Sequence, residues 1–222
     1  MTVLVLLGAP GAGKGTQASL LAKTLGIPHV ATGDLFRAAV RDGSPIGLEA
    51  RRFMERGQLV PDDITIRMLL DRLSKPDATS GAILDGFPRN GAQAQALDAA
   101  LAERDQRVDL STLIEVPDDE LIRRMSGRWV CREAGHVYNE STNPPVEAGR
   151  CDIDGSPLIQ RDDDKPDTIR ARLDLQLASL REVIDHYAST GILRTVDGMQ
   201  SIDDVFADLL AVVQAEPVRP DA

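Results

Sequence analysis

The sequence predicts an α/β protein built on a doubly wound parallel sheet, and two observations support that prediction. Short apolar runs recur along the chain, each followed by turn residues or by a helical pattern. Because strands that alternate with helices form right-handed βαβ units, this order predicts parallel strands covered by helices. The first apolar run also leads directly into a glycine-rich turn, which is typical of a phosphate-binding loop (P-loop).

The predicted strands follow from the apolar runs. Val3–Leu7 is continuously apolar, as expected for a strand that is buried on both faces of a sheet. Later apolar runs predict three more strands, at residues 82–84, 113–116 and 192–196. Thr16–Leu25 is predicted to be the first helix, with Gly26 as its C-terminal stop.

Two more helices are predicted near the end of the chain. Pro166–Ser189 has proline at its first position and Gly191 just past its end, which is the usual asymmetry of helix boundaries. The last helix is predicted to begin at Ser201 and to run to about Val213.

Two stretches interrupt this alternation. Residues 32–60 contain short helical pieces and turns but no clear strand, and residues 127–164 are rich in turn formers, as in "ESTNPPVEAGRCDIDGSP". Both are longer than an ordinary connection in a compact domain, and such insertions are often functional lids. We therefore expect a core domain of residues 1–31, 61–126 and 165–222 with two insertions.

The composition limits the classes of partner and the compartment. A net charge of −10 argues against binding to duplex nucleic acid, which requires a basic stripe. No apolar segment approaches the eighteen residues of a membrane span, and no basic region precedes the first apolar run as in a secretory signal. We expect a cytoplasmic monomer with small-molecule partners and no membrane contact. Cys131 and Cys151 are then expected to be thiols or metal ligands rather than a disulfide.

The stretch "GAPGAGKGT" carries the clearest chemistry. Gly8, Gly13 and Lys14 match the pattern G-x-x-x-x-G-K-[ST], in which backbone N–H groups surround an anion and the lysine adds a positive charge. The residue after the lysine is Gly15, and the expected hydroxyl comes one position later, at Thr16. The hydroxyl that usually binds a metal is therefore absent from its usual place.

The metal must then be held through water and a carboxylate elsewhere, or through the oxygens of the substrate itself. Asp85 ends the apolar run "AILDG", and the acidic residue that partners the metal of a P-loop usually ends a strand. We therefore expect Asp85 to bind Mg²⁺ through water.

Five segments together resemble the adenylate kinase family in its long form with an inserted lid. They are "GAPGAGKGTQ", "ATGDLFRAAV", "GQLVPD", "LDGFPRNGAQAQAL" and the "QRDDD…RARL" stretch, and they occur in the family's order over essentially the whole chain. The resemblance implies that residues 32–60 form the AMP-binding insertion and residues 127–164 the lid. It also implies reversible phosphoryl transfer from ATP to AMP, giving two ADP, with Mg²⁺.

The resemblance implies a donor side of the site. The residues that would contact ATP are Gly11, Ala12, Gly13, Lys14, Gly15, Thr16, Arg124, Arg128, Val137, Tyr138 and Gln200. Val137 and Tyr138 would border its base or ribose. Only the main chain of Gln200 is carried over, because some relatives have lysine there.

The resemblance also implies an acceptor side. The residues that would contact AMP are Thr32, Arg37, Gln58, Leu59, Val60, Gly86, Phe87, Pro88, Arg89, Gln93, Arg161 and Arg172. Arg37 and Arg89 would bind its phosphate, and the amide of Gln93 can both donate and accept at the adenine edge.

Phosphoryl transfer needs in-line positioning and neutralisation of charge, with no dedicated general base. The catalytic residues are therefore expected to be cations: Lys14, Arg37, Arg89, Arg124, Arg128, Arg161 and Arg172. Arg51 and Arg52 match no motif of this kind and are expected to be solvated surface residues.

The lid sequence raises the question of a second metal. Metal-bearing relatives grip Zn²⁺ with two C-x-x-C pairs, and here Ala134 and Asp154 stand at the second position of each pair. His136 lies two residues beyond Ala134, so Cys131, His136, Cys151 and Asp154 form a ligand set that zinc accepts. The favoured hypothesis is a structural zinc. The alternative is a metal-free lid held by hydrogen bonds, with Cys151 as a small buried apolar group.

Two other functions compete with this one. The first is a nucleoside monophosphate kinase that uses GTP as the donor or a different base on the acceptor. Thr32 and Gln93 favour AMP as the acceptor. The second is a nucleotide-switched binding protein whose zinc-ribbon-like segment grips a partner. A switch needs one nucleotide site and would not need the arginines of "GFPR" and "DLFR".

Overall fold

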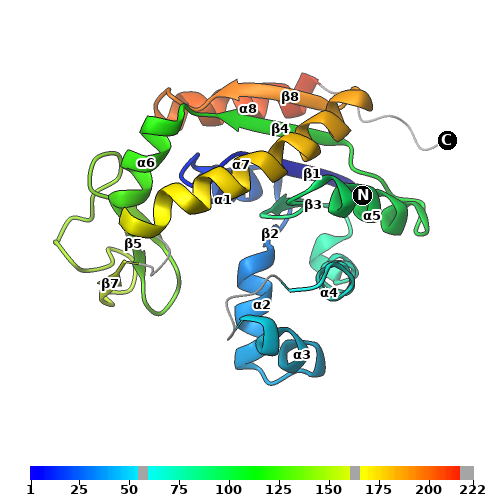
Figure 1. Ribbon diagram of the computed structural model, residues 1–222, viewed down its shortest axis with the longest axis horizontal. Coiled ribbons are helices and arrows are strands. Elements are labelled where there is room, and N and C mark those ends of the chain that lie inside the picture. Colours follow the sequence, from blue (N-terminus) through cyan, green and yellow to red (C-terminus); the bar gives the residue numbers. More distant parts are fainter. Residues whose placement is uncertain (55–59, 161–165, 216–222) are drawn as a thin grey trace.

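The computed structural model describes residues 1–54, 60–160 and 166–215, and Figure 1 shows their arrangement. Its centre is a parallel sheet of five strands in the order β2-β3-β1-β4-β8. The strands are β1 (Thr2–Leu7), β2 (His29–Ala31), β3 (Gly81–Asp85), β4 (Leu110–Glu115) and β8 (Leu193–Asp197). The predicted fold class is therefore confirmed.

The first strand is buried on both faces, as its continuous apolar run predicts. Val3, Val5 and Leu7 enter one hydrophobic cluster, whereas Leu4 and Leu6 enter the other. Successive side chains of a strand point to opposite faces, so two apolar layers of helices are needed to cover this sheet.

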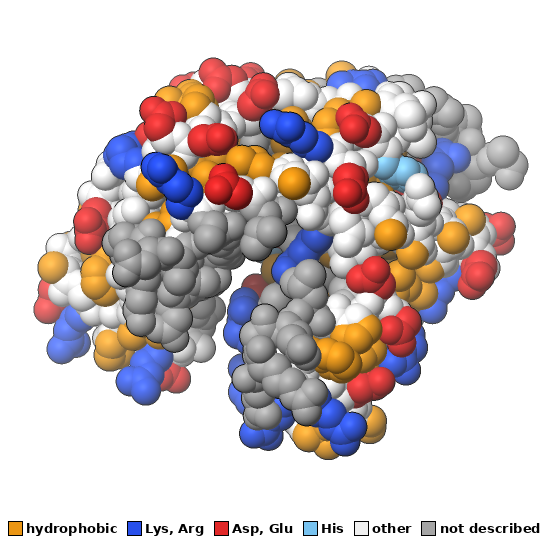
Figure 2. All heavy atoms as spheres, viewed as in Figure 1, with side chains coloured by type: hydrophobic (Ala, Val, Ile, Leu, Met, Phe, Trp, Pro, Cys, Tyr) orange, Lys and Arg blue, Asp and Glu red, His pale blue; other side chains and the backbone are white. Residues whose placement is uncertain are grey.

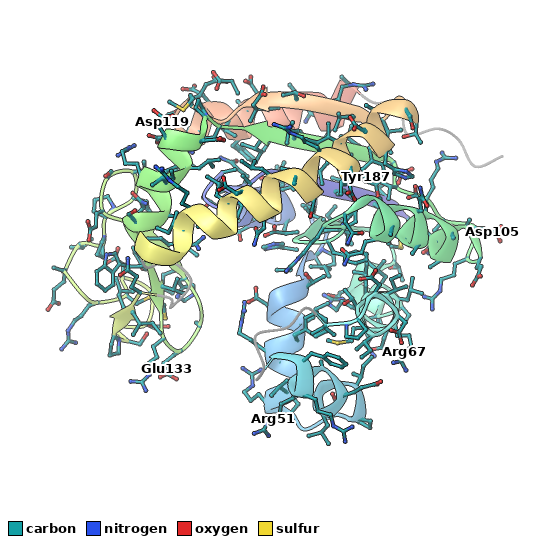
Figure 3. All side chains as sticks on the ribbon, in the orientation of Figure 1. Arg51, Arg67, Asp105, Asp119, Glu133 and Tyr187 are labelled. Carbon is teal, nitrogen blue, oxygen red and sulfur yellow. The ribbon has the colours of Figure 1, made fainter. Side chains whose placement is uncertain are left out.

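Helices supply both layers, as Figure 1 shows. On one face lie α4 (Asp62–Leu73), α5 (Gly91–Ala102) and α7 (Pro166–Ser189). On the other lie α1 (Lys14–Leu25), α6 (Asp118–Ser126) and α8 (Ile202–Ala215). A short 3₁₀ turn, η1 (Pro76–Ala78), leads into β3. Tyr187, labelled in Figure 3, anchors α7 by its fully buried side chain. No helix in the described part of the chain combines the length and apolarity needed to cross a bilayer.

A pair of helices extends below the sheet, and we call it the arm: α2 (Thr32–Arg41) and α3 (Pro45–Met54). The arm packs against α4 around a small cluster of Phe36, Ala50, Ile64 and Met68. Gly47 of α3 lies so close to α2 that a Cβ atom there would stand 2.0 Å from the carbonyl oxygen of Ala39. Arg51 and Arg52 are exposed, as expected, and Figure 3 shows Arg51 at the periphery of the arm.

A second, antiparallel sheet forms the lid, the name we use for β5 (Arg128–Cys131), β6 (Val137–Asn139), β7 (Leu158–Ile159) and the loops between them. Its strand order is β6-β5-β7, and its small core consists of Cys131, Tyr138, Cys151 and Leu158. Figure 2 shows a notch between the lid and the arm.

The structure corrects several predicted boundaries. The helix expected from Thr16 begins at Lys14, and the strand expected at residues 113–116 spans 110–115, because the buried polar residues Ser111 and Thr112 interrupt its apolar pattern. The strand β2 was not predicted, since three residues are too few to show a period. The lid strands are also short: β5 has four residues, β6 three and β7 two.

Candidate active site

Three strands deliver the candidate residues to one edge of the parallel sheet. The P-loop follows β1, Thr32 follows β2, and Asp85 ends β3 before "GFPR". The carboxyl ends of parallel strands meet at the same edge, and ligands bind there where the strand order reverses. Strands β3 and β2 lie on one side of β1, and β4 and β8 lie on the other, so the strand order reverses at β1 and its loop lies at that point.

The P-loop has the geometry of an anion cradle. Gly11 and Gly13 adopt φ values of 87° and 96°, a region that favours glycine. Helix α1 begins directly after Gly13, and no side chain caps its N-terminus. The first N–H groups of a helix and its positive end attract anions. Lys14 folds over this loop, since its Nζ donates to the carbonyl oxygens of Gly8 at 2.8 Å and Ala9 at 3.1 Å.

Asp85 lies beside the loop and is held there by His29. The distance from His29 Nε2 to Asp85 Oδ2 is 3.2 Å, and both side chains are largely buried. Burial raises the pKa of Asp85, but the hydrogen bond from His29 and the charges of Lys14 and Arg89 outweigh it and lower this pKa below its usual range. The carboxylate is therefore ionised. A Cβ atom on Gly15 would lie 3.6 Å from its oxygen, so Asp85 borders the first turn of α1.

A pocket of about 170 Å³ opens between this edge and the arm. Its walls combine apolar groups with two arginines, a threonine pair and a buried amide: Thr32, Gly33, Phe36, Arg37, Val60, Thr65, Gly86, Phe87, Arg89 and Gln93. The structure thus brings together most of the residues that the resemblance assigns to AMP. Pro88, in a cis peptide bond after Phe87, is buried next to this wall.

The carbonyl of Gly86 organises the polar side of the pocket. It accepts hydrogen bonds from Arg89 Nε at 2.7 Å and from Thr32 Oγ1 at 3.1 Å. Arg37 approaches from α2, where it forms an ion pair with Asp34, and its side chain is more than half exposed. Two guanidinium groups therefore reach the same pocket from different elements.

Gln93 has both ends of its amide engaged. Its Oε1 accepts the backbone N–H of Arg89 at 2.7 Å, and its Nε2 donates to Asp62 Oδ1 at 2.7 Å. Asn90 caps α5 by accepting the backbone N–H of Gln93 at 2.8 Å. The side chain is buried, so these contacts fix its orientation at the pocket wall.

The predicted donor-side arginines lie near the lid. Arg124 Nε donates to Glu120 at 2.7 Å, and its Nη2 donates to the carbonyl of Gly198 at 2.9 Å. Hydrogen bonds from Arg123 and Arg124 lower the pKa of Glu120 to about 2. Arg128 is half-buried at the start of β5. Arg124 is thus anchored, although a guanidinium has five donors and retains others.

Other predicted donor residues differ in exposure. Tyr138 is buried in the lid, where its hydroxyl lies 3.4 Å from Cys151 Sγ and accepts the N–H of Asp152 at 2.8 Å. Its side chain therefore belongs to the lid core, while the neighbouring Val137 is exposed. The side-chain amide of Gln200 donates to an aspartate of α8, which leaves its main chain for the predicted role.

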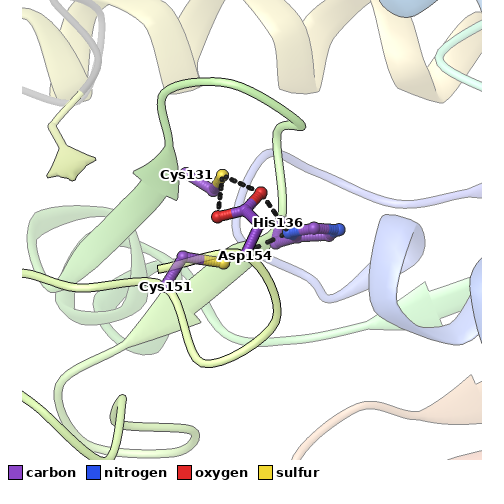
Figure 4. A group of neighbouring side chains, drawn as sticks. All are labelled: Cys131, His136, Cys151 and Asp154. Carbon is purple, nitrogen blue, oxygen red and sulfur yellow. Dashed lines mark hydrogen bonds and ion pairs between the residues drawn. The ribbon is translucent and has the colours of Figure 1, made fainter. Parts of the chain in front are cut away.

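The four predicted metal ligands converge in the lid (Figure 4). The ligand atoms of Cys131, His136, Cys151 and Asp154 all lie within 4.8 Å of one another. Cys131 Sγ is 3.2 Å from Asp154 Oδ2, and His136 Nδ1 is 3.2 Å from Cys151 Sγ. Ligand atoms around a tetrahedral zinc stand about 3.3–3.8 Å apart, so these four donors need only small shifts to surround the metal.

The same loops favour the thiolate form of Cys131. Burial raises the pKa of this thiol, but the polar contact with Ser156 Oγ at 2.9 Å and the hydrogen bond from the backbone N–H of Ala134 lower it to about 7. Bonds from the hydroxyl and backbone N–H of Ser156 also lower the pKa of Asp154 well below its usual range. Zinc binds the ionised forms of both groups. The cysteines are not joined in a disulfide, as expected.

Some predicted residues lie outside the part of the chain that the structure describes. These are Gln58, Leu59 and Arg161, together with the side chain of Arg172, whose backbone belongs to α7.

Two residues that hold site residues in place, His29 and Asp62, were not predicted from the sequence. His29 is 56 positions from Asp85, and Asp62 is 31 positions from Gln93. The available signals were local: His29 is a polar residue shortly before "ATGDLFR", and Asp62 is the carboxylate of the segment "GQLVPD" that carries the resemblance.

Comparison with known proteins agrees with the resemblance found in the sequence. The family model described as adenylate kinase matches residues 6–192. A curated adenylate kinase of Thermodesulfovibrio yellowstonii is 49% identical over 211 residues, which is 95% of this chain and 98% of the relative. Those of Carboxydothermus hydrogenoformans and Lysinibacillus sphaericus are 48% and 47% identical, over 95% and 96% of this chain and 99% and 98% of the relatives.

Proposed function

The chain belongs to the adenylate kinase family, and on that premise we propose that it transfers the terminal phosphoryl group of ATP reversibly to AMP, giving two molecules of ADP. One observation of the structure supports this most directly. A P-loop and an arginine-lined pocket lie at the same edge of one sheet, with the ionised Asp85 beside the loop and directly before the pocket wall.

On the donor side, the loop backbone from Gly11 to Thr16 would cradle the phosphates of ATP. Lys14 would leave the carbonyls of Gly8 and Ala9 and pair with the transferred group, since a charged oxygen is a stronger acceptor than a neutral carbonyl. Thr16 lies in the first turn of α1, next to a donor phosphate in this arrangement.

On the acceptor side, Arg37 and Arg89 would bind the phosphate of AMP. Planar guanidinium groups bind phosphate oxygens in pairs, which orients the nucleophile as well as neutralising it. Thr32 and Val60, with Gln58 and Leu59, would enclose the adenosine. The attacking oxygen is already anionic, so no general base is required.

Asp85 is proposed to hold the water shell of the Mg²⁺ that accompanies the nucleotide. That ion supplies charge neutralisation across the donor phosphates when it is bound. The contribution of the chain is to keep Asp85 ionised and oriented, and the 3.2 Å contact with His29 supports both.

The lid and the arm are proposed to close over the substrates. Arg124 and Arg128, with Arg161 and Arg172, would then surround the transferred group, and closure would exclude the water that could otherwise accept it. The notch between lid and arm in Figure 2 gives both elements room to move. We retain residues 32–60 and 127–164 as the bounds of the two moving segments.

A coupled assay of ADP formation from ATP and AMP tests the proposal, with GMP, CMP and UMP as alternative acceptors and GTP as alternative donor. We expect AMP to give the highest turnover, and faster turnover with another acceptor would identify a different kinase. A bisubstrate inhibitor, two adenosines joined by five phosphates, separates a kinase from a nucleotide switch. A kinase has both subsites and should bind it tightly, whereas failure to bind at micromolar concentration would favour the switch.

We further propose a structural zinc in the lid, held by Cys131, His136, Cys151 and Asp154. The convergence of four donor atoms of types that zinc accepts supports it. The hydrophobic cluster of the lid, with four buried residues, is small, and a metal would stiffen it. Metal analysis of protein purified without chelator tests the idea, and less than a tenth of an equivalent of zinc would favour the hydrogen-bonded alternative. The expectations of a cytoplasmic, monomeric enzyme stay predictions.

A further inference from the structure

The amide of Gln93 is held at both ends by partners of opposite polarity. The backbone N–H of Arg89 can only donate, and the carboxylate of Asp62 can only accept. The two contacts are each 2.7 Å long, and no exchange of the amide oxygen and nitrogen would satisfy both. A flipped amide would set N–H against N–H at one end and oxygen against carboxylate at the other.

With its amide held in this orientation, Gln93 offers a ligand one hydrogen-bond acceptor and one donor at fixed positions. After the two internal bonds, Oε1 retains one lone pair and Nε2 retains one hydrogen, and both belong to a buried side chain at the wall of the pocket. A purine can meet this edge with N1 and the group on C6. Adenine offers an acceptor at N1 and a donor at its amino group, whereas hypoxanthine and guanine offer the reverse.

We propose that Asp62 is a specificity-determining residue, which selects a 6-aminopurine monophosphate over a 6-oxopurine monophosphate by fixing the orientation of the Gln93 amide. The inference rests on the proposed function, because it assumes that this pocket binds the acceptor nucleotide. Asp62 acts through Gln93 and is therefore a positioning residue.

A purely structural role for Asp62 is the alternative. It stands in the first turn of α4, where any acidic residue interacts favourably with the helix dipole. Asp63 occupies the same turn, but its carboxylate faces Arg67 at 3.5 Å on the exposed surface. The two neighbours share charge and helix position and differ in their contact with Gln93, so Asp63→Asn is a matched control.

Asp62→Asn removes one of the two contacts that fix the amide while keeping the size of the side chain, and it leaves only the backbone N–H of Arg89 to orient Gln93. An asparagine amide can rotate to face either end of Gln93, so it no longer distinguishes the two orientations. A hydrogen bond to a charged group contributes enough to change an equilibrium by about tenfold or more. We therefore expect the ratio of kcat/KM for AMP to that for IMP to fall by about tenfold or more, with the KM for ATP unchanged.

The experiment measures kcat/KM for AMP and IMP at saturating ATP in the wild type, Asp62→Asn and Asp63→Asn, with the melting temperature of each. IMP differs from AMP only at N1 and C6, so it reports hydrogen-bond polarity without added bulk. A fall in the ratio for Asp62→Asn alone supports the inference. An unchanged ratio in active Asp62→Asn, or an equal fall in Asp63→Asn, overturns it.

Two controls separate the possible failures. If Asp62→Asn does not fold, Asp62→Ser removes the same carboxylate and is judged by the same ratio. If the wild type does not phosphorylate AMP, the proposed function fails, whereas a working wild type with an unaltered Asp62→Asn ratio refutes only the role of Asp62.

Discussion

Replacing Gly47 by alanine tests how the arm is built, and two opposing effects make the outcome informative. Gly47 lies inside α3, where alanine is the better helix former by about 1 kcal/mol. Propensity alone therefore predicts stabilisation. The structure predicts the opposite, because the added Cβ would stand 2.0 Å from the carbonyl oxygen of Ala39 and 2.3 Å from its carbonyl carbon.

The size of the clash decides between the two effects. Real Cβ contacts essentially never fall below 3.0 Å, so α3 must move away from α2 by about 1 Å. The obstructing atoms belong to the backbone and cannot rotate aside. Overpacking of this kind costs about 1–3 kcal/mol, and a gap of 1 Å also forfeits up to half of each dispersion contact between the helices. We expect Gly47→Ala to lower the free energy of unfolding by about 1–2 kcal/mol after the propensity gain.

The displacement should also reach the acceptor pocket. Helix α2 contacts α3 directly and carries Thr32 and Arg37 into the pocket. The KM for AMP should rise severalfold, while the KM for ATP should not change, because the P-loop lies on another element. Urea unfolding and the coupled assay measure the two effects. Leu48→Ala, at an exposed neighbouring position, is the control and should change stability by less than about 0.5 kcal/mol. A Gly47→Ala protein as stable as the wild type, with an unaltered KM for AMP, would refute the reasoning.

Further predictions concern the P-loop, the carboxylate beside it and the lid. Lys14→Ala should lower kcat by about 10²-fold or more in the coupled assay, since it removes a charge aimed at the transition state; a loss under threefold would contradict that role. His29→Ala should raise the Mg²⁺ concentration needed for half-maximal rate. His29→Gln keeps a hydrogen-bond donor for Asp85, so its Mg²⁺ requirement should stay close to that of the wild type; an equal increase in both variants would argue against the contact. Cys151→Ser should lose zinc in metal analysis, with the surface variant Glu133→Gln as the control. Because protonation competes with metal at Cys131, whose pKa is about 7, zinc affinity should fall as the pH drops below 7, as measured against a competing chelator; a flat profile from pH 7 to 5.5 would contradict binding through that thiolate.

Local pattern was sufficient for the core of the fold. The apolar run Val3–Leu7 predicted a strand buried on both faces, and both hydrophobic clusters meet there. The short strand β2 was not predicted because its three residues do not show a period. The predicted span of β4 began too late because Ser111 and Thr112 are buried although they are polar. In each case the burial of the strand depends on neighbours far away in sequence.

Some residues of the candidate site could likewise be identified from the sequence, whereas the contacts of others could not. Gly8, Gly13 and Lys14 could be identified from spacing alone, because a phosphate loop is built from consecutive residues between a strand and a helix. The position of Asp85 at a strand end could also be identified from spacing. Nothing in the spacing indicated that Tyr138 would be buried in the lid core or that Arg124 would be bonded to Gly198.

The sequence by itself determined the parallel α/β core, the phosphate loop, the family resemblance and the four candidate zinc ligands, because each depends on residues within a few positions or on motifs in order. Only the tertiary structure decided that His29 holds Asp85, that Asp62 and Arg89 orient Gln93, and that the lid ligands converge. These contacts join residues many positions apart in sequence. Their geometry follows from strand order and helix packing, which bring distant side chains to one edge of a sheet or into one small core.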